Sequence, residues 1–134
     1  MLDKTVREIM STQVYTAERG EILFEVTARM ASHNIGAVVV TEKGVPVGMF
    51  SERDLLKRVV YRDISAHSCY LGEVMTPKVE SISPDDAVQE VTERMKLYRH
   101  RHLPVVEDGN LIGIVSLRDL LAAYTEAYEQ VVAE

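Results

Sequence analysis

Two stretches of the chain carry the same pattern of serine, one variable residue, arginine and aspartate, at residues 51–54 and 116–119. A serine followed three residues later by an acid is typical of a capping box, with the serine as cap and the acid favoured by the helix dipole. A hydroxyl and free N–H groups at a helix start can also bind an anion or polar ligand. An aspartate there can accept two hydrogen bonds from a ribose diol. The pattern alone supports both interpretations.

The two stretches belong to a longer repeat. Residues 48–56 recur at 113–121, and the shift of 65 positions (119 minus 54) also relates residues 25–30 to 90–95. Self-similarity at a fixed shift indicates one supersecondary unit used twice. A unit of roughly 55 residues buries only a marginal share of its surface, so we expect the two copies to share one core. The repeated pattern then predicts two related, non-identical sites.

Each copy is predicted to have the order β-α-β-β-α. Strands are expected at 14–16, 37–40 and 47–50 in copy one and at 79–81, 103–106 and 111–115 in copy two, with helices between the first two strands and after the third. Ser83 followed by Pro84 predicts the start of the first helix of copy two. Lys43-Gly44 and Asp108-Gly109 supply the turns. Gly48 and Gly113 allow backbone to approach closely, or only ease strand packing.

The domain boundaries follow from this parse. We assign residues 1–62 to repeat 1, 63–69 to a connector, and 70–134 to repeat 2 with an extended last helix. Apolar positions from Tyr124 to Val132 share one face of that helix. The face packs on its own domain or forms a dimer contact.

Composition limits the function classes. The chain has 134 residues, a net charge of −6 and one cysteine. The negative charge argues against nucleic-acid and anionic-membrane binding, and no apolar run approaches the roughly 18 residues that span a bilayer. The single Cys69 rules out an internal disulfide framework and favours a cytoplasmic protein. It is interpreted as a small packing side chain, and a redox role would need exposure and a lowered pKa.

The whole pattern resembles a pair of CBS domains, the Bateman module. The resemblance rests on the repeated Gly-x-x-Ser-x-Arg-Asp-Leu-Leu, on Val-Met-Thr-Pro at 74–77 and on His-Leu-Pro-Val-Val at 102–106, and it covers nearly the whole chain, as in a stand-alone member. It implies a mixed α/β (α+β) fold in which two β-α-β-β-α repeats, related by a pseudo-twofold axis, pack through their sheets into one module. It also implies two clefts for adenosine-containing ligands, with the aspartate holding the ribose and the serine contacting ribose or phosphate.

The family's contacts carry over residue by residue. Cleft one would combine Met49, Ser51, Arg53 and Asp54 with Lys78, Val79, Arg101 and His102. Cleft two would combine Ile114, Ser116, Arg118 and Asp119 with Gln13, Val14, Gly36 and Ala37. Thr16 and Ser81, at the ends of the first strands, are secondary candidates.

The two clefts differ in charge. Copy two carries the basic run Arg99–His102, whereas the matching residues 34–37 of copy one are uncharged. Phosphate prefers arginine forks and charge-assisted donors, so we expect cleft one, which receives this run, to be the phosphate site. The run is alternatively a solvated connector. His100 and His102 share a face on an extended segment, but nothing completes a metal set, even with His67 or Cys69. Tyr15 and Tyr98 are expected either to stack on a base or to be half-buried side chains with a structural role.

The function expected from these observations is a non-enzymatic sensor. It would bind AMP, ADP or ATP as a regulatory ligand, need no obligatory cofactor, form a homodimer, and be read by a partner protein. S-adenosylmethionine or NAD is the alternative ligand, and a ligand-independent dimerisation scaffold is the alternative function. Catalysis is not expected, because the sequence has no nucleophile–base set, Walker loop or metal constellation.

Overall fold

The computed structural model describes residues 3–133. The chain forms two compact units: a middle unit, Val14–Val79, and a terminal unit made of the described residues before and after it. This division does not follow the two repeats as they run along the sequence. The leading segment of repeat 1, residues 3–13, folds in the terminal unit, and the leading segment of repeat 2, residues 70–79, folds in the middle unit.

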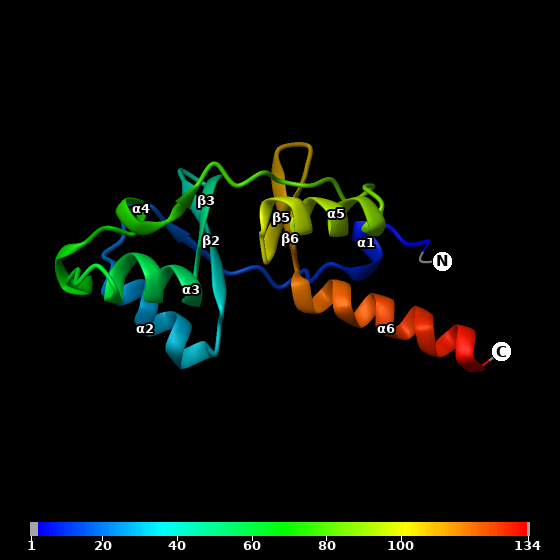
Figure 1. Ribbon diagram of the computed structural model, residues 1–134. Helices are drawn as coiled ribbons and strands as arrows, with labels where there is room; N and C mark the ends of the chain where they lie inside the picture. The colour runs from blue at the N-terminus through cyan, green and yellow to red at the C-terminus, as the bar shows by residue number, and fades with distance from the viewer. Residues whose placement is uncertain (1–2, 134) are drawn as a thin grey trace. The chain divides into compact units, whose positions relative to one another are not determined.

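The middle unit is a four-stranded sheet with helices packed on it (Figure 1). In chain order its elements are β1 (Thr16–Glu18), α2 (Leu23–His33), β2 (Ala37–Glu42), β3 (Val45–Ser51), α3 (Glu52–Asp54), the π-helical η1 (Leu55–Val60), the 3₁₀ turn η2 (Ala66–Ser68), α4 (Leu71–Val74) and β4 (Thr76–Pro77). Strand β1 runs parallel to β2, and β3 is antiparallel to β2 and β4. The apolar faces of α2 and the strands bury Leu23, Val26 and Phe50 completely or nearly so.

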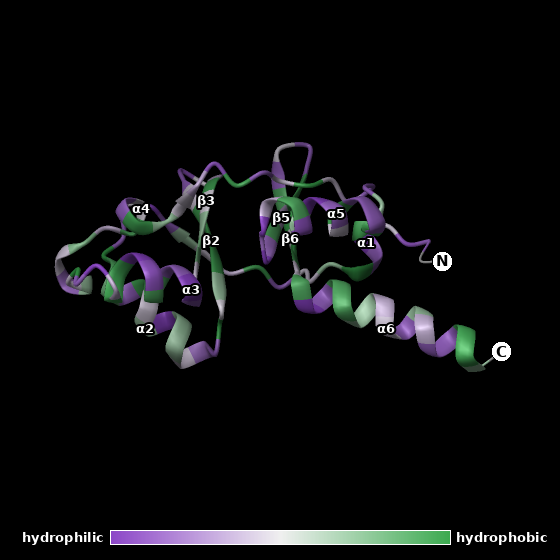
Figure 2. Ribbon diagram, in the orientation of Figure 1, coloured by the Kyte–Doolittle hydropathy of each residue, from purple (hydrophilic) through white to green (hydrophobic). Residues whose placement is uncertain are grey.

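The terminal unit is built on a two-stranded hairpin. Its elements are α1 (Val6–Ile9), α5 (Val88–Tyr98), β5 (His102–Glu107), β6 (Asn110–Ser116) and α6 (Leu117–Ala133), with β5 antiparallel to β6. The N-terminal segment is tied in by hydrogen bonds from Val6 N to Asp86 O and from Val88 N to Lys4 O. Figure 2 shows apolar residues along the strands and on helix faces of both units.

Two of the predicted elements of copy two are wrong. Helix α5 begins at Val88 rather than at Ser83, because Ser83 and Asp86 close a turn instead: the Ser83 N–H donates to Asp86 Oδ2, and the Asp85 N–H donates to Ser83 Oγ. Residues 79–81 form no strand. Only Ile82 bridges Val105, in parallel. The remaining predicted strands and helices appear within a few residues of their expected places.

Candidate functional site

Both Ser-x-Arg-Asp stretches form the predicted capping boxes. In copy one, Asp54 Oδ2 accepts hydrogen bonds from the Ser51 N–H at 2.9 Å and the Ser51 hydroxyl at 3.1 Å. In copy two, Asp119 Oδ2 accepts from the Ser116 N–H at 2.7 Å and its hydroxyl at 2.9 Å. Each cap therefore engages one oxygen of a half-buried carboxylate and leaves the other, Oδ1, for a further partner.

In copy one that second oxygen is already engaged. Asp54 Oδ1 accepts a hydrogen bond from the Thr76 hydroxyl at 2.9 Å and lies 3.3 Å from Arg58 Nε. Arg58 also donates from Nη1 to the carbonyl of Met75 at 3.1 Å. The Asp54 side chain is only 13% exposed. All four residues belong to the middle unit, so this closed arrangement is internal to it.

Copy two lacks the two contacts that engage this oxygen in copy one. The positions that match Thr76 and Arg58 hold Ser11 and Ala123, and the Ser11 hydroxyl accepts a hydrogen bond from the Gln13 N–H. An alanine carries no donor, so the ion pair of Asp54 with Arg58 has no counterpart at Asp119. The Ser116 cap holds Asp119 through Oδ2.

The charge beside the two caps also differs. In the terminal unit, the Leu117 N–H donates to the Arg101 carbonyl at 2.8 Å, and His102 pairs with Ser116 across the hairpin. In the middle unit, the matching bond joins Glu52 N–H to the Gly36 carbonyl at 3.0 Å. A Cβ on Gly36 would lie 3.1 Å from Glu52 Oε1. Copy two thus has Arg101 where copy one has Gly36, and the side chain beside Gly36 is the acidic Glu52.

The two units divide the sequence-predicted residues differently from the predicted clefts. The middle unit contains Met49, Ser51, Arg53, Asp54, Lys78 and Val79, and also Val14, Thr16 and Ala37. The terminal unit contains Ser81, Arg101, His102, Ile114, Ser116, Arg118 and Asp119. Arg101 and His102 therefore share a unit with Asp119, because β5 begins where β6 ends. The expected grouping of these two residues with Asp54 draws on both units and stays a prediction.

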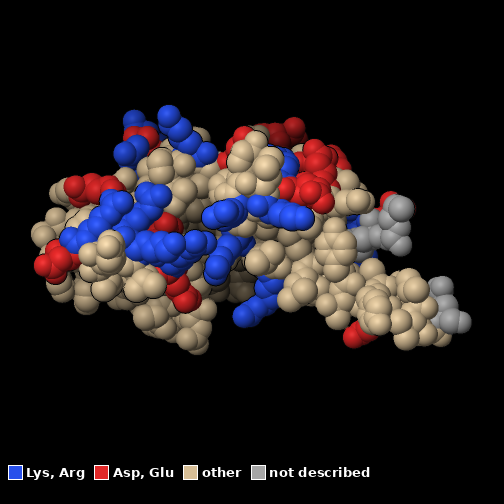
Figure 3. Space-filling model, in the orientation of Figure 1, with Lys and Arg blue, Asp and Glu red and all other residues tan. Residues whose placement is uncertain are grey.

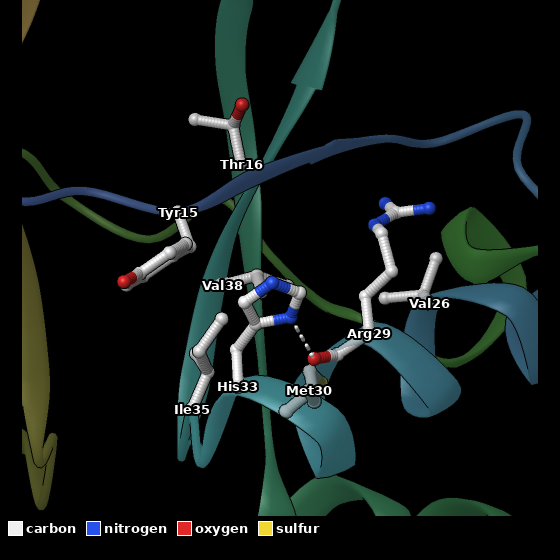
Figure 4. Close-up of a pocket in the computed structure, with 8 residues that line it drawn as sticks. All are labelled: Tyr15, Thr16, Val26, Arg29, Met30, His33, Ile35 and Val38. Atoms are coloured by element: carbon white, nitrogen blue, oxygen red, sulfur yellow. Dashed lines mark hydrogen bonds between the residues drawn. The ribbon is translucent and has the colours of Figure 1, made fainter.

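The middle unit also contains a pocket of about 240 Å³ beside β1 and α2 (Figure 4). It is lined by Tyr15, Thr16, Val26, Arg29, Met30, His33, Ile35 and Val38. Its polar groups are partly engaged: Arg29 makes two hydrogen bonds to Glu21, and His33 Nδ1 lies 3.0 Å from the Arg29 carbonyl. Bonding to Arg29 lowers the pKa of the Glu21 carboxyl. Sequence reasoning named Tyr15 and Thr16 but missed the α2 residues, whose apolar spacing indicated only core.

The alternative sites considered in the sequence receive other roles. No group of three or more His, Cys, Asp or Glu side chains suited to a metal ion occurs in residues 3–133. His67 stacks on Phe24 with ring centroids 4.1 Å apart, and Tyr98 stacks on His100. Cys69 is buried, and that burial raises the pKa of its thiol, which is opposite to what a reactive thiol needs.

Comparison with known proteins identifies the family. The CBS domain model matches residues 6–61 and 71–126. The CBS domain-containing protein YhcV of Bacillus subtilis is 34% identical over 116 residues, which cover 87% of this chain and 82% of YhcV. The crystal structure of a CBS-domain containing protein from Agrobacterium tumefaciens superposes with a TM-score of 0.82 at 32% identity, covering 90% of this chain and 99% of that one.

A third solved structure is the CBS domain pair of protein MJ0100 in complex with 5′-methylthioadenosine and S-adenosyl-L-methionine. It has a TM-score of 0.81 at 25% identity and covers 93% of this chain and 98% of its own. Among the described residues, no helix is both long and apolar enough to cross a membrane. With two family matches, the repeated motifs and the superposed structures in agreement, this chain belongs to the CBS domain family and is a tandem CBS pair.

Proposed function

We propose that this CBS pair is a non-enzymatic sensor of an adenosine-containing ligand, with AMP, ADP or ATP as the favoured class. The observation that carries the proposal is Asp119: the Ser116 cap fixes the carboxylate through one oxygen, and the arginine that pairs with the matching Asp54 is replaced by Ala123. A carboxylate fixed in this way suits the diol of a ribose, since an ionised carboxylate only accepts hydrogen bonds. The MJ0100 pair, which is 25% identical, was solved with two adenosyl ligands.

The basic residues of the terminal unit favour a phosphate on that ligand. Arg101 adjoins the Ser116 cap through the bond from the Leu117 N–H, and Arg118 lies in the first turn of α6. Guanidinium groups bind phosphate with charge-assisted forked hydrogen bonds. A nucleotide with its ribose at Asp119 and its phosphate toward Arg101 would use both features of this unit. The grouping of Arg101 with Asp54, transferred from the family pattern, stays a prediction beside this one.

We propose that another protein reads the state of the CBS pair. Helix α6 exposes Leu117, Leu121 and Tyr128 to 52%, 67% and 70%. These residues and Val131 are four, seven and three positions apart, and Tyr124 in the gap of seven completes the four-and-three spacing of a helix-pairing seam. We propose that α6 of a second copy of this chain packs on this seam to form a homodimer. An effector protein would then recognise the homodimer. Ligand binding would shift the population between its shapes.

Two alternatives keep specific support. S-adenosylmethionine is favoured by its presence in the MJ0100 complex, but a cationic sulfonium would have to bind near Arg101 and Arg118. A ligand-independent scaffold is compatible with the exposed α6 seam. The scaffold predicts no change in melting temperature with any adenosyl compound, because only a ligand that binds the folded state raises its apparent stability.

Calorimetric titration of adenosine and AMP separates these possibilities. Wild type is expected to bind AMP more tightly than adenosine. Asp119→Asn should weaken both ligands, whereas Arg101→Met should remove only the advantage that the phosphate confers. Asp85→Asn, an exposed aspartate in a turn of the same unit, is the matched control and should bind as wild type. Equal binding by wild type and Asp119→Asn contradicts the proposal.

A further inference from the structure

The two aspartates that the family pattern assigns to ribose differ in what already holds them. Asp54 Oδ1 is engaged by Thr76 and Arg58, whereas the position that matches Arg58 beside Asp119 is Ala123. We propose that Arg58 is an internal competitor for ribose at Asp54, so that a ligand binds there only by displacing the guanidinium. The inference rests on the proposed function, since it concerns the same class of ligand at the other repeat.

The geometry makes displacement necessary. The Ser51 cap places two hydrogen bonds on Asp54 Oδ2, Thr76 places a third on Oδ1, and Arg58 Nε lies 3.3 Å from Oδ1 as an ion pair. A carboxylate has about four lone-pair positions, so a diol with two hydroxyls finds at most one without a hydrogen bond, and the guanidinium lies beside it. The side chain is only 13% exposed, which leaves little room for a further group. A ribose must therefore displace the guanidinium or the Thr76 hydroxyl from Oδ1.

Of the two groups at Asp54 Oδ1, Arg58 is the one that a ligand can displace. The Thr76 hydroxyl is carried on a short side chain of β4, which pairs with Met49 of β3 and is fixed by the sheet. The Arg58 side chain is long, is 35% exposed, and approaches Asp54 from one turn further along the helix. Besides this ion pair, it donates a hydrogen bond to the Met75 carbonyl, just before β4. Displacement of Arg58 would release that carbonyl as well, and would thus couple the ligand to residues 75–77.

The displaced guanidinium also selects the ligand. It would remain tethered within a side chain's length of Asp54, on a face where Lys and Arg side chains already gather over α3 (Figure 3). The basic residues of this stretch are Arg53, Lys57 and Arg58. A cation there attracts an anionic ligand and repels a sulfonium. The Asp54 site should therefore bind ribosyl phosphates and exclude S-adenosylmethionine. Adenosine should not displace Arg58, because it has no phosphate with which the guanidinium can pair.

The test counts adenosine sites by calorimetry on the full chain. Wild type should bind one adenosine, at Asp119. Arg58→Met keeps most of the aliphatic stem, removes the competing cation, and should add a second site, at least about tenfold tighter than any Asp54 binding in wild type. Adding Asp54→Asn to Arg58→Met should remove that second site. Arg62→Met, the same substitution at an exposed arginine in the turn after η1, is the matched control and should keep one site.

Thr76→Val provides a second variant in case Arg58→Met fails to fold, as judged by its thermal unfolding. It removes the hydroxyl donor to Oδ1 and should also strengthen adenosine binding at Asp54, by a smaller factor. A single site in folded Arg58→Met and unchanged binding in Thr76→Val would overturn the inference while leaving the proposed function intact. No adenosine binding to any of these proteins would overturn both.

Discussion

At the scale of single residues, the helix cap and the proposed ligand site share one side chain. Asp119 uses Oδ2 for the cap, so the capping interpretation of the Ser-x-Arg-Asp pattern is confirmed, and the ligand interpretation is a proposal that concerns the same carboxylate. The cap was predictable because its partners are three residues apart. The Asp54–Arg58 pair, at a spacing of four, carried a signal in the sequence that was missed. The Thr76 contact carried none, since it depends on strand pairing across 22 positions.

The Glu21–Arg29 pair gives a pH prediction at this scale. The pKa of Glu21 in the folded protein lies below its ordinary value of 4.5, chiefly because Arg29 donates to the carboxylate. A lowered folded-state pKa means that the pair stabilises the fold above about pH 4.5 and loses this contribution as the pH falls through the folded value. Glu21→Gln should therefore lower the melting temperature at pH 7 but not at pH 2.

The expected change is small, because both side chains are partly exposed and solvent screens them. Glu93→Gln, at an exposed position in the middle of α5 and away from both helix ends, is the control and should melt as wild type at both pH values. A melting difference between Glu21→Gln and wild type that persists at pH 2 would show that the side chain acts by something other than its charge.

At the scale of elements, two glycines let a leading segment approach a strand closely. Gly48 of β3 faces residues 75–76, and Gly113 of β6 faces residues 10–11. A Cβ on Gly48 would lie 2.5 Å from the Thr76 carbonyl oxygen, and one on Gly113 would lie 2.9 Å from the Ser11 carbonyl oxygen. Of the two roles considered for these residues, close backbone approach is the one that the structure supports. Sequence alone left the choice open because the approaching strand comes from a distant segment.

Gly48→Ala should therefore separate β3 from β4. Overpacking of this kind costs about 1–3 kcal/mol, so urea unfolding should show a lower midpoint for the variant. Because Thr76 donates to Asp54, the variant should also disturb the Asp54 site. Gly20→Ala is the matched control, since a Cβ there meets nothing within 4 Å, and it should unfold as wild type. Equal midpoints for the two variants would contradict the close approach.

At the scale of the whole molecule, the repeats exchange their leading segments. The shift of 65 residues predicted two copies of one β-α-β-β-α unit, and most strands and helices follow it. It could not predict the exchange, because periodicity does not say which copy a segment joins. It also overestimated the symmetry of the two copies. Copy two lacks the first strand, and because of the turn at Ser83–Asp86 its first helix begins only at Val88.

A substitution at Val6 tests whether the leading segment of repeat 1 folds with repeat 2. Its side chain is fully buried, and its N–H donates to the Asp86 carbonyl in the terminal unit. Val6→Ala should destabilise the protein by about 1–2 kcal/mol, the value of two buried methyl groups. Native-state hydrogen exchange should be faster in the variant than in wild type, and the increase should be larger in β5 and β6 than in β2 and β3. Faster exchange confined to β2 and β3 would mean that the N-terminal segment folds with its own repeat.

The central claim is that the ribose diol of an adenosine ligand binds at Asp119. The most direct measurement compares AMP with 2′,3′-dideoxy-AMP, which lacks both hydroxyls, on wild type and on Asp119→Asn. Wild type should prefer AMP by about ten- to a hundredfold, the value of hydrogen bonds to a charged group, and Asp119→Asn should lose most of that preference. Equal affinity of wild type for the two nucleotides, or an undiminished preference in Asp119→Asn, would contradict the account.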